Sequence, residues 1–108
     1  MVTVEYQIDP GRAAAFVEVM QETRRARLRL GVLSWGLFRD AEWPGRYVEY
    51  FVDETWTEHL RRLERFSESD KGLRDRRLAF HQGDEPPKVR RCVADQSVPA
   101  AGLLTGHP

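Results

Sequence analysis

Residues 46–60 constrain the fold most, because they predict a β-strand that turns directly into a helix. Residues 47–52 are mostly β-branched and aromatic, which favours a strand. Thr55 followed by Glu58 has the pattern of a capping box, in which each side chain satisfies a backbone donor at the start of a helix. The helix is therefore predicted to begin near Trp56.

The rest of the chain predicts further strands and helices in a recognisable order. Alternating apolar and polar residues predict a strand over residues 2–8, and Asp9 and Pro10 suit the start of a helix that runs to about Leu30. The other predicted elements are strands at residues 32–38, 46–53 and 88–93, and helices at residues 56–66 and 68–81. This order is that of the ferredoxin-like βαββαβ fold, an α+β class with an antiparallel sheet.

Large apolar side chains occupy both faces of the second predicted strand. Trp35 and Leu37 point one way, whereas Val32 and Phe38 point the other. Such strands indicate that both faces of the sheet are covered. Helices can cover one face, and a chain of 108 residues has nothing left for the other. We therefore expect a homodimer in which a second copy completes a dimeric α/β barrel.

Length, charge and hydropathy restrict the class of protein. The chain suffices for one domain, predicted at residues 1–93, with a C-terminal tail at residues 94–108 that is rich in Ala, Gly, Ser and Pro. The formal net charge is zero, which disfavours a broad attraction to nucleic acid or anionic lipid. No apolar run approaches the ~20 residues of a membrane helix, and the N-terminus lacks a signal-peptide pattern. We expect a cytoplasmic protein without membrane insertion.

Two further kinds of binding are disfavoured by the residues themselves. Residues 46–51 have an aromatic pattern like that of an RNA-recognition motif, but the acidic Glu49 on the same strand would repel phosphate. The three histidines and the single cysteine, Cys92, lack the spacing of metal ligands. We expect no nucleic acid and no metal, and Cys92 is interpreted as a small buried residue on the last strand.

The predicted second helix carries the main candidate for chemistry. His59 could stabilise an anion or transfer a proton, because an unperturbed imidazole has a pKa of ~6.5. The alternative is a partly buried histidine bonded to a neighbouring group. Trp35 and Trp56 could stack on a flat aromatic ligand, with core packing as the alternative. Tyr6 or Tyr50 could donate a hydrogen bond to the same ligand.

The remaining helix faces follow from hydropathy. Leu60 and Leu63 are predicted to face the core from the second helix. Arginine-rich runs at residues 24–29, 61–65 and 74–77 are predicted to be solvated helix faces, because acidic residues nearby supply exposed ion-pair partners.

Residues 2–93 resemble the antibiotic biosynthesis monooxygenase family of dimeric α/β barrels. The resemblance rests on the strand at residues 2–8, on residues 35–40, and on the strand-to-helix corner at residues 51–60. It is closest to a subgroup that often forms the soluble C-terminal extension of major-facilitator-type exporters, through residues 58–60 and the later Phe80-His81 pair.

The resemblance carries expectations about activity. Family enzymes oxidise electron-rich aromatic polyketides or quinols with O₂ and no bound cofactor, and some relatives degrade haem with an asparagine in the first strand. This sequence contains no asparagine, which disfavours haem degradation. The resemblance implies a cofactor-independent monooxygenase, with His59 catalytic and Trp35, Trp56, Tyr6 and Tyr50 around the substrate. The alternative is a non-catalytic dimeric ligand-binding or regulatory module related to an exporter-associated domain.

Overall fold

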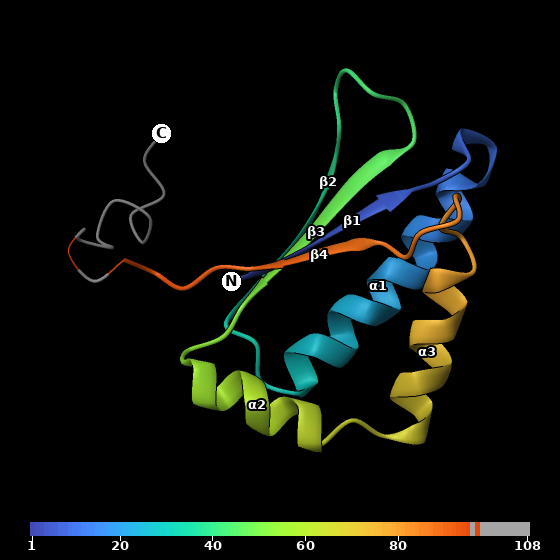
Figure 1. The fold of residues 1–108 in the computed structure, drawn as a ribbon. Helices are drawn as coiled ribbons and strands as arrows, with labels where there is room; N and C mark the ends of the chain where they lie inside the picture. Colours follow the sequence, from blue (N-terminus) through green and yellow to red (C-terminus); the bar gives the residue numbers. More distant parts are fainter. Residues whose placement is uncertain (96, 98–108) are drawn as a thin grey trace.

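Four antiparallel strands form one sheet, and the described helices all lie on one face of it (Figure 1). The computed structural model describes residues 1–95 and 97. The strands are β1 (Val2–Gln7), β2 (Ser34–Arg39), β3 (Arg46–Val52) and β4 (Lys88–Arg91), in the spatial order β2-β3-β1-β4. The helices are α1 (Ala13–Arg29), α2 (Trp56–Glu64) and α3 (Glu68–Leu78), with a short 3₁₀ helix η1 (Pro10–Arg12) before α1. The predicted ferredoxin-like α+β fold is confirmed.

The helix-facing side of the sheet forms the core. Alternation along β1 buries Val4 and Tyr6, and the antiparallel register sets them opposite Glu49 and Tyr47 of β3. Phe16 from α1 is fully buried against this layer. The strand pattern thus selects which face receives the helices, because successive side chains alternate between faces.

Local signals place most helix ends close to their predicted positions. Asp9 accepts a hydrogen bond from the Gly11 amide at 3.0 Å, but the first turn is 3₁₀ and α1 begins only at Ala13. After α1, Gly31 adopts a φ of 106°, which L-residues with a side chain rarely tolerate. Ser67 caps α3 in a reciprocal capping box with Asp70.

The predicted orientation of α2 is wrong. Leu60 and Leu63 are 45% and 56% exposed, whereas His59 and Arg62 are buried. The physical reason is that the inner face of α2 lies against the end of β3, where Asp53 offers a carboxylate to both buried side chains. The inner face of α2 therefore carries a buried ion pair in place of the predicted leucines.

Two of the three arginine runs contain a buried member and the third contains a half-buried one, so the prediction of solvated faces is wrong for these residues. Arg62 and Arg77 are buried, and Arg27 is mostly shielded and bound to Glu49. Cys92 is exposed rather than buried, because it follows the edge strand β4, whose residues are all exposed.

The other face of the sheet has no covering element in the described part of the chain (Figure 1). Phe38 and Tyr50 stack on this face with ring centroids 5.8 Å apart. A second copy seated here stays a prediction. Every helix within residues 1–95 and 97 is too short or too polar to span a bilayer. Residues 98–108 of the predicted tail lie outside the described residues.

Candidate functional site

A cavity of about 500 Å³ lies where β1 begins, β3 ends and α2 begins. Trp56 and His59 line it from α2, and Asp53 lines it from the loop after β3. Arg91 and Met1 complete the wall from β4 and the N-terminus, which a hydrogen bond from the Met1 amine to the Cys92 carbonyl holds in place. Side chains from four separate segments therefore meet around one space.

The cap of α2 explains why His59 lines the cavity. The Thr55 hydroxyl accepts a hydrogen bond from the Glu58 amide at 3.1 Å, which starts α2 at Trp56 as predicted. Glu58 pairs with Arg61 at 2.9 Å, so the reciprocal half of the predicted capping box is not seen here. His59 then lies in the first turn, close above the loop that contains Asp53.

Asp53, His59 and Arg62 form a buried cluster. The His59 Nδ1 lies 3.0 Å from Asp53 Oδ2, and the Arg62 guanidinium forms an ion pair with the other Asp53 oxygen. All three side chains are about equally shielded. Within the described residues, His59 Nε2 is buried and has no hydrogen-bond partner. The imidazole is therefore held by Asp53 at Nδ1, and its Nε2 has no hydrogen-bond partner among the described residues.

The protonation state of His59 follows from this arrangement. Burial of the ring lowers the pKa of His59, and the positive charges of Arg91 and the N-terminal amine lower it further. A neutral imidazole next to an ionised carboxylate carries its proton on Nδ1, because Asp53 can only accept. Nε2 then bears the lone pair, so the geometry is that of a general base oriented by a carboxylate.

Trp56 fixes the plane of the imidazole. Its indole stacks on the His59 ring with centroids 5.0 Å apart and planes 27° apart. Trp56 is nevertheless 51% exposed, so one face of the indole is open to solvent or ligand. The structure thus brings together two of the five residues predicted for the site, His59 and Trp56.

A second buried cluster collects Tyr6 and Trp35 around Glu49. The Glu49 carboxylate is 0% exposed and accepts hydrogen bonds from the Tyr6 hydroxyl at 3.0 Å and the Trp35 indole at 2.7 Å. Arg27 completes its coordination at 2.5 and 3.2 Å. Burial alone would raise the pKa of Glu49, but Arg27 and the hydrogen bond from Trp35 reverse the effect and lower it. Burial raises the pKa of Tyr6, so its hydroxyl stays protonated.

The five predicted residues thus lie in three places. His59 and Trp56 share the first cavity. Tyr6, which is 1% exposed, and Trp35 both bind Glu49, and Trp35 also lines a second cavity between α1 and β2. Tyr50 lies on the opposite face of the sheet. There the Tyr50 hydroxyl shares a hydrogen bond with Ser34. Tyr50 is therefore separated by the sheet from the cavity that contains His59.

Sequence reasoning missed the partners of both clusters. Asp53 and Arg62 flank His59 on the same corner, and an acid six residues before a histidine at a strand end was a usable signal. Glu49 was also visible as the one acid within an apolar strand. Its role was not, because its partner Arg27 lies in another element, 22 residues away.

Comparisons with solved structures agree with the fold. A variant of SnoaB, a cofactor-independent oxygenase from Streptomyces nogalater, has a TM-score of 0.72 at 18% identity, over 91% of this chain and 94% of that one. A candidate antibiotic biosynthesis monooxygenase from Bordetella bronchiseptica has a TM-score of 0.67 at 25% identity, over 86% and 95%. Another from Nitrosomonas europaea has a TM-score of 0.67 at 20% identity, over 82% and 83%.

The sequence itself also matches a family. Residues 1–98 match the model of the family described as transmembrane secretion effector. None of the curated proteins compared with the chain matches it. The family match covers all three described helices and all four strands, and thus the whole of the Asp53–His59 site.

Proposed function

The chain belongs to the transmembrane secretion effector family, and we propose that it oxidises an electron-rich aromatic molecule of the polyketide or quinol type with O₂ and without a bound cofactor. The carrying observation is His59, held by Asp53 at Nδ1 with Nε2 unpartnered among the described residues, at the wall of a cavity of about 500 Å³. That volume lies in the range of small-molecule sites. The structural likeness to a cofactor-independent oxygenase supports the same reaction class.

The chemistry that the site can support is proton removal. His59 Nε2 takes a proton from an acidic CH₂ or hydroxyl group of the substrate, and Asp53 stabilises the imidazolium that forms. For an anthrone-type CH₂, the carbanion gives one electron to O₂, and the two radicals join in a new C–O bond. The peroxide takes back the proton from His59 and then loses water, which leaves a carbonyl. One O₂ is consumed and one water is released, so atoms and electrons balance.

Access to the base depends on Trp56. His59 Nε2 is buried, and the Trp56 indole stacks on the same ring. We assign Trp56 the role of stacking wall, whose outward movement admits a flat substrate to Nε2. The homodimer predicted from the two-sided strands belongs to this proposal, with the second copy on the face that carries Phe38 and Tyr50.

A second candidate function is ligand binding without turnover, in a regulatory module linked to an exporter. The family description favours it, since it refers to transmembrane secretion. The burial of Nε2 suits it as well, because a ligand stacked on the outer face of Trp56 need not reach the base.

Oxygen consumption separates the two functions. Wild-type protein is incubated with anthrone-like and quinol substrates, and the initial rate is compared with His59→Ala and with buffer. The matched control is His81→Gln. His81 accepts a hydrogen bond from the backbone N–H of Gln7 and lines neither of the two cavities. An enzyme loses about 10²-fold or more in rate in His59→Ala only. Wild-type rates equal to buffer, with quenching of Trp56 fluorescence by the same compounds, would establish the binding module instead.

A further inference from the structure

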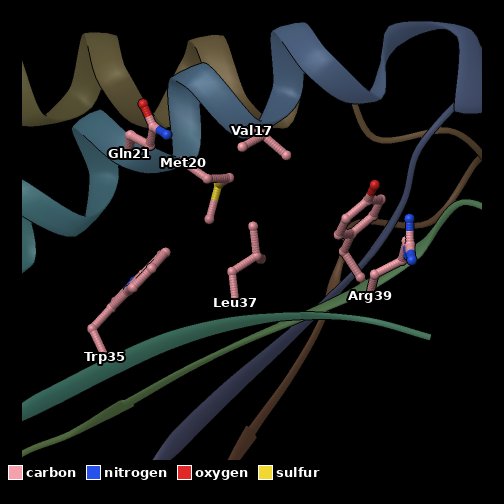
Figure 2. A pocket seen from close by; sticks show the side chains of 7 residues that line it. Val17, Met20, Gln21, Trp35, Leu37 and Arg39 are labelled. Carbon is pink, nitrogen blue, oxygen red and sulfur yellow. The ribbon is translucent and has the colours of Figure 1, made fainter. Parts of the chain in front are cut away.

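A second cavity, of about 510 Å³, lies between α1 and the edge strand β2. Figure 2 shows Met20 of α1 facing Leu37 of β2, with Trp35 of β2 to one side. α1 packs against β2, and the cavity lies between this helix and the helix-facing side of the strand. It shares no lining residue with the cavity that contains His59.

The walls of the α1–β2 cavity combine apolar side chains with the polar Gln21 and Arg39, and the indole of Trp35 is held in place by a hydrogen bond. Trp35 donates its indole N–H to Glu49 at 2.7 Å, and Glu49 is itself fixed by Arg27 and Tyr6. The buried carboxylate therefore sets the plane of the indole before any ligand arrives. A preordered aromatic wall lowers the entropy cost of binding a flat molecule.

Charge defines one end of this cavity. Arg39 is the one charged residue that lines it, and no carboxylate does. Arg39 is exposed, and its guanidinium makes no ion pair within the described part of the chain. Its position opposite Tyr47 in the β2–β3 register puts it on the helix-facing side of the sheet, at the mouth of the cavity.

We propose that the α1–β2 cavity is a second ligand site, which takes a flat aromatic carboxylate with its ring system against Trp35 and Leu37 and its acidic group at Arg39. The charge of Arg39 and the absence of a lining carboxylate select an acid over a neutral molecule of the same shape. The site does not depend on the function proposed for His59, because the two cavities have separate walls.

The three tryptophans report on the two cavities separately. Trp35 lines the α1–β2 cavity, Trp56 lines the His59 cavity, and Trp43 lies in the β2–β3 loop and lines neither. Protein labelled with 5-fluorotryptophan therefore gives one ¹⁹F resonance for each cavity and one internal reference. The Trp43→Phe and Trp56→Phe variants assign the signals.

The probes are 2-naphthoate and 2-naphthamide, which have the same ring system and differ in charge. We expect 2-naphthoate to shift the Trp35 resonance in a saturable way, to leave Trp43 unchanged, and to bind more tightly than 2-naphthamide. Arg39→Gln lowers the affinity for 2-naphthoate about tenfold or more, since a charge-assisted hydrogen bond is lost. Gln21→Phe, at an exposed position of the lining, fills the cavity and weakens both probes.

The matched control is Arg90→Gln. Arg90 also lies on an edge strand, but its register opposite Thr3 puts it on the uncovered face of the sheet. Binding of 2-naphthoate by this variant should equal that of the wild type. The proposal is overturned if 2-naphthoate shifts only Trp56, if 2-naphthamide binds equally well, or if Arg39→Gln binds 2-naphthoate as tightly as wild-type protein.

Discussion

Two buried ionic clusters lie close together in the sequence, one at the middle of β3 and one directly after its end, and they differ in how completely their polar atoms are satisfied. Glu49 accepts from Tyr6, Trp35 and Arg27 and is wholly shielded. In the other cluster, Asp53 binds His59 and Arg62, yet His59 Nε2 and two Arg62 nitrogens, Nε and Nη1, have no partner among residues 1–95 and 97.

The difference indicates that the two clusters have different roles, one in stability and one in chemistry. A saturated buried carboxylate ties its own strand to three other elements and has no capacity left for a ligand. An unsatisfied buried nitrogen next to a cavity costs stability, and such a cost is expected where a substrate makes the missing contact. We therefore interpret the Glu49 cluster as structural and the Asp53 cluster as the reactive one.

The largest effect should come from Glu49→Ala. Removing the carboxylate leaves the Arg27, Tyr6 and Trp35 donors without their shared acceptor, which should lower the free energy of unfolding by about 3–5 kcal/mol. Urea denaturation followed by circular dichroism measures it. Asp53→Ala is the comparison and should cost less than half as much. Equal losses in the two variants would remove the contrast between the clusters.

Asp53→Asn tests the reactive cluster next. The amide cannot stabilise the imidazolium and can donate to Nδ1, which places the proton on the wrong nitrogen. We expect kcat for oxidation to fall roughly 10²-fold with little change in KM, as measured by oxygen consumption. Unaltered kcat would show that Asp53 does not orient His59 during turnover.

The same substitution, arginine to methionine, compares the two clusters. Arg27→Met removes the main cation from fully buried Glu49 and should cost about 3 kcal/mol. Arg62→Met also removes a cation, but it eliminates two buried donors that have no described partner, so the net cost should be about 1 kcal/mol or less. The difference in urea midpoint between the two variants measures this. A larger loss in Arg62→Met would contradict our interpretation.

The smallest effect concerns pH. Because burial lowers the pKa of His59 below its ordinary value of 6.5, the unfolded chain binds a proton in a pH range where the folded chain does not. Relative to His59→Gln, the wild type should therefore lose stability as pH falls below about 6.5, and show a constant difference above it. Paired urea titrations across this range measure the trend. A gain in relative stability on acidification would mean that the charge of Asp53 outweighs the burial of the ring.

Much of the fold could be predicted because its signals are local. Alternation in β1, the caps at Thr55 and Ser67, and the glycine after α1 each depend on residues a few positions apart. The site could be predicted only in part. His59 and Trp56 lie one turn apart on one helix, so their proximity follows from helical geometry.

The sequence by itself determined the order of strands and helices, the starts of α2 and α3, and the closeness of Trp56 to His59, since short-range backbone and side-chain contacts control all three. Only the tertiary structure decided that Leu60 and Leu63 face outward and that Arg27 meets Glu49. It also decided that Tyr50 lies across the sheet from the His59 cavity. The physical reason is that a buried charge needs an opposite charge beside it, even one that lies far away in the sequence. That requirement outweighs the hydropathy of a single helix.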